Sequence, residues 1–247
     1  MKKALALISF LVFSDFSYAQ KNIVKTNLFS LALNNYNLTY ERALSKKISI
    51  TASYRTMPKG SAPLKKYIED YVGRNDFEIN SFKLSNTAIT LESRLYLGRK
   101  TLNGVYLAPY LRYTDYGFVF PITHPQNFSP GGNVNNPPIL LSGNIQALCG
   151  GFMMGLQSNL SKKLVLDVTI IGAHFGKSKG SLTANNITPA LDSTDLASFQ
   201  QTINDYQEVG PFKFEGRVYE DGTGAEQKAS GPWIGIRTIS FSLGYRF

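Results

Sequence analysis

The sequence predicts an all-β protein, an eight-stranded antiparallel transmembrane β-barrel whose long extracellular loops carry short helices. Three observations lead to this prediction. The last fifteen residues, Trp233 to Phe247, alternate with a strict period of two, as the two faces of a β-strand do. Tight and long connections alternate along the chain, which is typical of outer-membrane barrels. After residue 20, no run approaches the roughly 20 apolar residues that a membrane helix requires.

The terminal strand places its large apolar side chains on one face. The residues of this face are Phe241, Leu243, Tyr245 and Phe247. Small polar residues and Arg246 alternate with them, a pattern that suits a strand with lipid outside and a polar lumen inside. A terminal aromatic residue also resembles the C-terminal signal by which the barrel-assembly machinery recognises its clients. These four apolar residues are therefore the predicted assembly signal.

Residues 1–19 read as a secretory signal peptide. Lys2 and Lys3 precede an apolar stretch over residues 4–13, and Ser17 and Ala19 suit a cleavage site. This arrangement is typical of a signal peptide and too short for a membrane span. We therefore predict that residues 20–247 are exported and form one barrel in the outer membrane.

Composition narrows the class of protein. The chain contains 14 Tyr and 16 Phe, as expected for strands with aromatic girdles at the membrane interfaces. Its single Cys149 excludes an internal disulfide. The net charge of +9 would suit nucleic acid as a partner, but the export signal and the barrel pattern exclude it. A soluble β-sandwich shares this composition, but it has no reason to alternate short and long connections.

Eight strands follow from the alternation of apolar and polar residues. They are predicted over residues 23–33, 37–44, 48–55, 82–97, 105–120, 143–160, 164–176 and 233–247. The first strand has no clear facing, because its polar residues Asn27 and Ser30 fall on opposite parities. The second and third alternate around a tight turn at residues 45–47, the fourth and fifth around residues 98–104, and the sixth and seventh around residues 161–163.

Three long connections are predicted to face outward, over residues 56–81, 121–141 and 177–232. Apolar residues at helical spacing predict a short helix in the first and in the last of them. The apolar faces of these helices carry Tyr67, Ile68, Tyr71, Leu196, Phe199, Ile203 and Tyr206. Such faces pack on each other, cover the barrel mouth, or dock onto a neighbouring envelope protein.

The inward parities carry charged residues. They are Glu41, Arg55, Glu92, Arg94, Arg112 and Asp167. The turn positions predict Glu92 opposite Tyr110 and diagonal to Arg112, and Asp167 opposite Gln157. An eight-stranded barrel is just wide enough for side chains, and an unpaired buried charge costs several kcal/mol. We therefore expect a polar network of salt bridges that fills the lumen, in preference to a gated ion path.

His174 and Ser178 support one enzyme hypothesis. They share the predicted outward parity of the seventh strand, and some outer-membrane lipid A deacylases use a His and a Ser of this kind. The spacing differs from that of those enzymes, and no acidic partner lies on the same face. An ordinary interfacial histidine is the favoured interpretation. His124 has no metal-ligating neighbours, and no metal or cofactor is predicted.

Basic residues near the predicted outer rim suggest contact with lipopolysaccharide phosphates. They are Lys59, Lys65, Lys66, Arg74, Lys177 and Lys179. Solvated loops carry lysine for solubility as well, and the two interpretations stay open.

The segment KTNLFSLALNNYNLTYER at residues 25–42, the strand YLAPYLRY at residues 106–113 and the aromatic C-terminus resemble a family of small outer-membrane barrels of unassigned function. The chain is more distantly similar to the OmpX and OmpA barrel groups. The resemblance implies an eight-stranded fold and an outer-membrane location, and it carries no catalytic residues. The leading expectation is a non-enzymatic structural or interaction protein that works through its loops, as an accessory subunit of an envelope complex. A lipid A deacylase-like enzyme and a narrow channel are the alternatives.

Overall fold

The structure is a computed structural model, and it describes residues 21–61, 82–122, 136–205, 207–209 and 211–247. These residues form one sheet of eleven strands. The first seven are β1 (Asn22–Asn27), β2 (Tyr36–Ala43), β3 (Ile48–Ser61), β4 (Lys83–Tyr96), β5 (Gly104–Ile122), β6 (Ile139–Asn159) and β7 (Leu164–Asn185). The others are β8 (Glu208–Val209), β9 (Phe212–Val218), β10 (Gly224–Arg237) and β11 (Ser240–Arg246), with helices α2 (Leu28–Ala32) and α4 (Ser193–Asp205).

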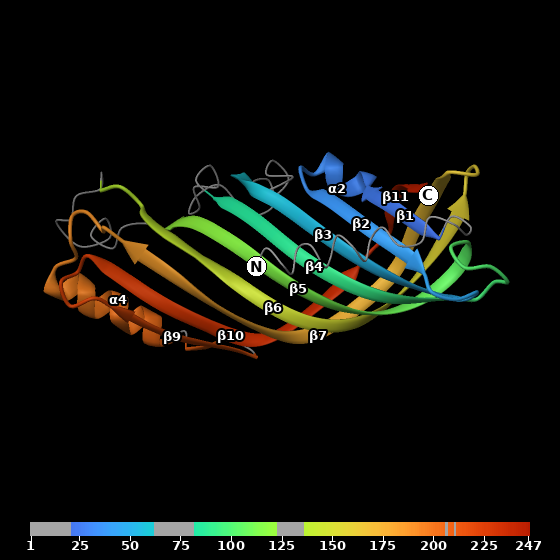
Figure 1. Ribbon diagram of the computed structural model, residues 1–247. Helices are drawn as coiled ribbons and strands as arrows, with labels where there is room; N and C mark the ends of the chain where they lie inside the picture. Colours follow the sequence, from blue (N-terminus) through green and yellow to red (C-terminus); the bar gives the residue numbers. More distant parts are fainter. Residues whose placement is uncertain (1–20, 62–81, 123–135, 206, 210) are drawn as a thin grey trace, which may run out of the picture.

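Eight of these strands close a ring. Strands β1 to β7 pair in sequence order, and β11 pairs antiparallel with both β1 and β7. The tight turns between the strands gather at one end of the ring, and α4 lies at the other (Figure 1). The predicted eight-stranded antiparallel barrel is confirmed. Among the described residues, no helix has the length and apolar character needed to cross a membrane.

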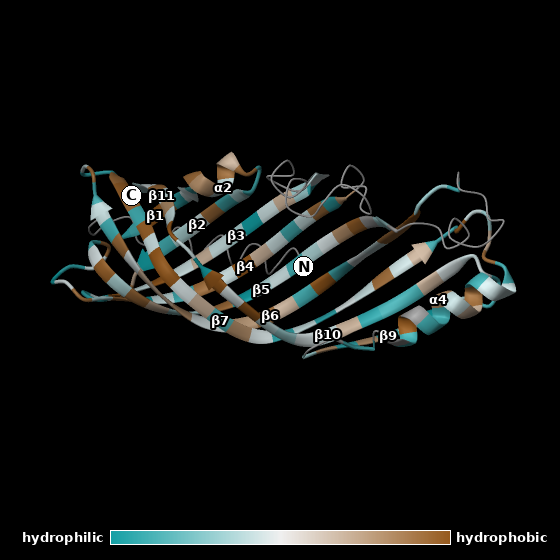
Figure 2. Ribbon diagram, turned by 180° about the vertical axis from the view of Figure 1, so that it is seen from behind, coloured by the Kyte–Doolittle hydropathy of each residue, from teal (hydrophilic) through white to brown (hydrophobic). Residues whose placement is uncertain are grey.

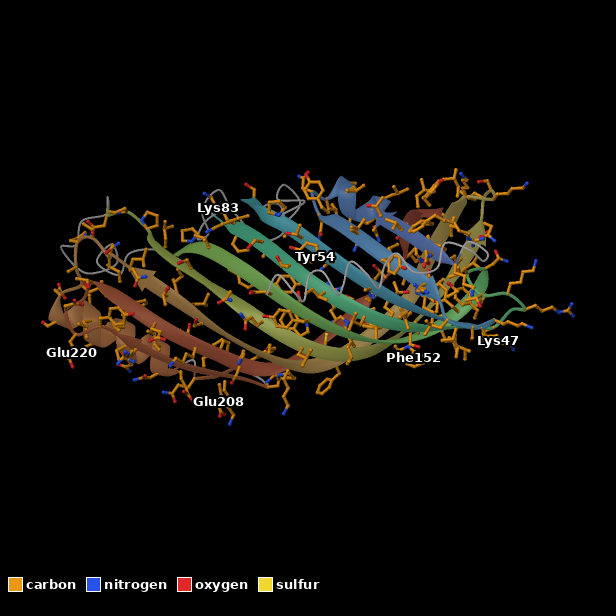
Figure 3. All side chains as sticks on the ribbon, in the orientation of Figure 1. Lys47, Tyr54, Lys83, Phe152, Glu208 and Glu220 are labelled. Atoms are coloured by element: carbon orange, nitrogen blue, oxygen red, sulfur yellow. The ribbon has the colours of Figure 1, made fainter. Side chains whose placement is uncertain are left out.

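The outer surface of the ring is apolar. Apolar and polar residues alternate along its strands (Figure 2), and Phe152 points away from the sheet (Figure 3). Exposed side chains that continue this surface from strand to strand are Leu38, Tyr54, Ile89, Tyr113, Leu148, Phe175 and Ile234. Adjacent members of this series are register partners or lie two residues from one. A continuous belt of exposed apolar side chains is the surface that a barrel presents to lipid.

The eighth strand is split in two. β11 completes the ring, whereas β10 pairs with β7 through residues 172–185 and with β9 on its other edge. Within the described part of the chain, β10 has no strand partner in the ring except β7. β7 and β10 therefore extend the sheet beyond the closed part of the ring, toward α4 (Figure 1).

The first and last connections differ from the sequence prediction. The first strand ends at Asn27 and not at residue 33, because the Asn27 side chain accepts a hydrogen bond from Ser30 N (2.8 Å) and caps α2. This helix explains the mixed parity of the segment. Residues 177–232, predicted as a loop, contain the ends of β7 and β10 and the whole of α4, β8 and β9. Tyr67, Ile68, Tyr71, His124 and Tyr206 lie outside the described residues.

A β-bulge interrupts β7. Met154 pairs with Ile171 and Gly155 with Thr169, so Ile170 has no partner on β6. Ile170 and Ile171 are both exposed on the lipid side. An extra residue of this kind reverses the parity of everything that follows it. The outer half of β7 therefore faces in the opposite sense to the one that the sequence predicts.

Candidate functional site

The lumen is centred on Lys25. Its Nζ lies 2.5 Å from Glu41 Oε2, 2.5 Å from Asp167 Oδ2 and 2.7 Å from Gln157 Oε1. These four residues come from β1, β2, β7 and β6 and are almost fully buried. One ammonium group therefore ties four strands together inside the ring.

Arg94 extends the ion pairs. Its Nη1 lies 2.6 Å from Asp167 Oδ2, and its Nη2 lies 2.8 Å from Glu92 Oε2. The guanidinium stacks over the Tyr106 ring with 4.3 Å between Cζ and the ring centroid. Planar stacking and a forked donor geometry suit Arg for buried pairs. We call Lys25, Glu41, Glu92, Arg94 and Asp167 the ion-pair network.

Hydroxyl groups complete the ion-pair network. Tyr96 donates to Glu41 Oε1 (2.7 Å), and Tyr106 donates to Asp167 Oδ1 (2.8 Å). Ser49 also donates to Glu41 Oε1 (2.5 Å). The buried carboxylates thus have partners on both oxygens, as a stable buried charge requires. The ion-pair network fills the turn end of the lumen with paired charge.

The structure brings together four of the six predicted lumen residues. Glu41, Glu92, Arg94 and Asp167 join the ion-pair network, and the predicted opposites Glu92 with Tyr110 and Asp167 with Gln157 are register partners. The predicted diagonal pair of Glu92 with Arg112 is not formed, because Glu92 binds Arg94 and lies 3.4 Å from Arg237 Nη1.

The remaining two predicted lumen residues lie beside a small cavity. Arg55, Arg112 and Arg237 line a polar cavity of about 60 Å³. The ion-pair network borders the same cavity through Lys25, Glu92, Arg94 and Asp167. Lys25 and Arg237 also lie in the lumen, but the sequence does not predict them as lumen residues. Lys25 shares its inward parity with the apolar Ile23, and Arg237 precedes the break between β10 and β11, so neither stands in a clean alternation.

His174 and Ser178 bind different partners. Both face inward after the bulge, so the predicted outward facing is wrong. Tyr110 OH lies 3.0 Å from His174 Nδ1, and Ser178 donates to the Gly231 carbonyl (3.1 Å). Four residues of strand separate them by about 13 Å, at roughly 3.3 Å per residue. A base must lie within hydrogen-bonding distance of the hydroxyl that it activates.

The predicted helix in the last connection exists, but its apolar face is covered. Leu196, Phe199 and Ile203 of α4 pack against a buried cluster from the neighbouring strands and loops. The buried members of that cluster are Ile139, Ala184, Ile187, Leu191, Val218 and Ala225. We call α4, β8, β9 and the ends of β7 and β10 at residues 177–185 and 224–232 the α4 lobe. It has a hydrophobic core of its own.

The side chain of Gln200 protects the free edge of the α4 lobe. Its Oε1 accepts from Val218 N (2.7 Å), and its Nε2 donates to the Gly216 carbonyl (3.3 Å). Exposed strand edges invite pairing with other chains unless they are covered. α4 therefore covers the free edge of β9 through Gln200, and it covers the apolar face of β9 through the cluster that contains Val218.

Comparisons with known proteins give a family and several distant structures. Residues 5–180 match the family described as Protein of unknown function (DUF3575). Solved structures that resemble the chain include CarO of Acinetobacter baumannii (11% identity, TM-score 0.38, 93% of this chain and 98% of that chain). The outer membrane protease OmpT of Escherichia coli gives 8% identity, a TM-score of 0.34 and coverage of 95% and 99%. The translocator domain of the autotransporter NalP of Neisseria meningitidis gives 10% identity and a TM-score of 0.31, and the match covers 100% of this chain and 95% of that chain.

No curated protein matches the chain. The family match covers well over half of the residues and agrees with the predicted resemblance to a barrel family of unassigned function. The protein therefore belongs to the family described as Protein of unknown function (DUF3575).

Proposed function

We propose that this protein is a non-enzymatic outer-membrane barrel that acts as a structural or interaction protein through its extracellular part. Its place would be that of an accessory subunit in an envelope complex. The observation that carries the proposal is the ion-pair network, which closes the turn end of the lumen. The outward strand faces are apolar and committed to lipid. Recognition of a partner would then depend on the parts of the chain that lie outside the lipid-facing belt.

The α4 lobe is the described part best suited to recognition. It is folded around its own apolar cluster and stands at the end opposite the tight turns (Figure 1). Because its apolar helix face is covered, its exposed surface is polar, and charge is the feature that a partner would read. Residues 181–231 carry eight acidic and three basic residues. Their exposed carboxylates include Glu208, Glu215, Glu220 and Asp221.

One of these carboxylates is held in its charged form by its own turn. Asp221 accepts hydrogen bonds from Thr223 N (3.0 Å) and Thr223 Oγ1 (2.8 Å). These bonds lower the pKa of the Asp221 carboxyl below its usual value. The four carboxylates favour a partner with a basic surface, and complementary charge of this kind gives specificity and a faster association rate.

The two alternatives have less support. The separation of His174 from Ser178 along β7 gives no nucleophile and base in contact, which weakens the lipid-modifying hypothesis. A narrow channel requires a path past Lys25 and Arg94, and both side chains are held by short ion pairs.

Co-purification from native membranes in mild detergent tests the proposal. A variant with Glu208, Glu215 and Glu220 changed to Gln and Asp221 changed to Asn should lose a partner that the wild type retains. The matched control neutralises four exposed charges at the opposite end, at Lys46, Lys47, Lys162 and Lys163, and should retain that partner. Heat-modifiable migration establishes that both variants are folded. The same set of co-purified proteins from wild type and the lobe variant would contradict the proposal.

A further inference from the structure

Three arginines converge on the small cavity above the ion-pair network. Arg55 comes from β3, Arg112 from β5 and Arg237 from the end of β10. Arg55 Nη2 donates to Asn86 Oδ1 (2.8 Å), and the Arg55 side chain also interacts with Tyr116. Arg112 Nη1 donates to Thr90 Oγ1 (3.4 Å). Arg237 stacks over the Tyr110 ring, with 5.1 Å between Cζ and the centroid. The walls around them carry serine and threonine.

Charge in this region is not balanced. The cationic side chains of the cavity and the ion-pair network are Lys25, Arg55, Arg94, Arg112 and Arg237. The carboxylates beside them are Glu41, Glu92 and Asp167, and all three are already paired with Lys25 or Arg94. The excess positive charge therefore falls on the three arginines above the network, where Glu92 is the nearest carboxylate, 3.4 Å from Arg237.

The three guanidinium groups repel one another. Arg112 experiences the charges of both Arg55 and Arg237, and Arg55 also experiences that of Arg237. Arg55 Nε is buried and has no hydrogen-bond partner among the described residues. Unpaired buried charge and an unsatisfied donor both cost free energy. An anion placed among the three groups would relieve both costs.

An aromatic wall adjoins the arginines. Tyr116 and Trp233 lie with 5.5 Å between their ring centroids, and Phe118 stacks on Tyr116 at 6.2 Å. These side chains come from β5 and β10, and small residues of β6 and β7, such as Cys149 and Gly176, lie between the two strands in the register. These rings do not line the cavity itself. They lie beside it, and Tyr116 interacts with the Arg55 side chain.

We propose that this cavity binds an oxyanion that carries a planar apolar group. Arginine forks match the oxygens of phosphate and carboxylate in pairs, and a flat ring would stack against Tyr116 and Trp233. Access is available, because the Arg237 side chain is 27% exposed and β10 is not paired with β1 in the described structure. The phosphate part of this chemistry is common to a soluble aryl phosphate and to the phosphorylated headgroup of a lipid.

Trp233 is the chain's one tryptophan and reports on this site directly. Phenyl phosphate added to the folded barrel in neutral detergent should change the Trp233 emission saturably. Inorganic phosphate should act at concentrations about tenfold higher, and phenol should have no saturable effect. Arg112→Gln should weaken the affinity for phenyl phosphate at least tenfold. Arg217→Gln, whose side chain is 75% exposed in the α4 lobe, is the control and should leave it unchanged.

Thermal unfolding separates ligand binding from a merely structural role. Phenyl phosphate should raise the Tm of the wild type and not that of Arg112→Gln, and without ligand the variant should be at least as stable as the wild type. A folded Arg112→Gln with unchanged affinity, or a wild type with no saturable response, would overturn the proposal. Lipid A added to the micelles distinguishes the sources: competition with phenyl phosphate assigns a lipid headgroup, and its absence assigns a soluble anion.

Discussion

Lys25 Nζ and Asp167 Oδ2 lie 2.5 Å apart and join β1 to β7 through the lumen. These are the two strands that flank β11 in the ring. The ion pair thus crosses the closing strand on its inner side, where only short pairings hold the ring together. Closure of the barrel and the filling of its lumen depend on the same two residues.

We predict that Lys25→Met destabilises the folded barrel by about 3–5 kcal/mol, because it leaves Glu41 and Asp167 buried without their main partner. Urea unfolding in lipid vesicles, followed by Trp233 fluorescence, measures the change. Lys162→Met, at an exposed turn position, is the control and should change stability by less than about 0.5 kcal/mol. Equal losses in the two variants would contradict the role assigned to Lys25.

Two glycines of β6 give a matched pair for the packing of the lumen. A Cβ at Gly155 would overlap the Tyr106 hydroxyl and lie 2.7 Å from the Val168 carbonyl oxygen, whereas one at Gly150 would meet nothing closer than Leu111 Cδ2 at 3.7 Å. Gly155→Ala should therefore cost about 1–3 kcal/mol, and Gly150→Ala should be tolerated. The same unfolding measurement compares them, and a tolerated Gly155→Ala would show that Tyr106 does not pack as described.

Labelling in intact cells tests the orientation in the membrane. Lys47 and Glu220 lie at opposite ends of the barrel (Figure 3), and both are exposed. We predict that a membrane-impermeant thiol reagent labels Glu220→Cys and not Lys47→Cys while the outer membrane is intact. The native Cys149 is buried and should stay silent. Labelling of Lys47→Cys alone would reverse the predicted topology.

The period of two predicts the lipid-facing belt well, because each strand separates lipid from a polar lumen and the two faces differ in chemistry. The alternation along β7 is interrupted at Ile170. Ile170 and Ile171 are both apolar and both suit a lipid-facing position, so the sequence alone does not reveal the bulge at Ile170. The predicted facing of His174 and Ser178 is therefore wrong, because it is counted along β7 from residues that precede the bulge.

The α4 lobe could not be predicted as a sheet, because its part of β10 has no alternating pattern. Beyond the belt, the sequence of β10 from residue 224 to 232 has no alternation of large apolar and polar side chains to detect. Its strands are held by pairing with β7 and β9 and by the cluster under α4. The arginine cavity was equally hidden, because Arg237 reaches it from a strand end that the period of two does not place.

The C-terminal residue tests the assembly signal. Phe247 is exposed on the lipid side, whereas Arg246 points inward and donates to the Leu102 carbonyl (2.9 Å). Phe247→Lys should reduce the amount of heat-modifiable folded barrel severalfold, because it removes the aromatic residue from the lipid interface. Arg246→Gln should have the milder effect, a loss of the charge-assisted hydrogen bonds to the Leu102 carbonyl and to Asn159 Oδ1. Equal yields of folded barrel from the two variants would refute the role of the terminal aromatic residue.

His174 and Ser178 decide between the enzyme hypothesis and the interaction hypothesis. If they catalysed ester cleavage, His174→Asn and Ser178→Ala would each abolish any change that the protein makes to lipid A, since nucleophile and base act as a unit. We predict no effect from either substitution. His174 is held by Tyr110 and Ser178 by the Gly231 carbonyl, and both face the inside of the sheet, away from the lipid surface that an acyl chain occupies. Mass spectrometry of lipid A from cells with and without the protein is the measurement. A missing acyl chain that returns in the Ser178→Ala strain would contradict the proposed non-enzymatic function, and an unchanged profile in all strains is the outcome that the geometry of β7 leads us to expect.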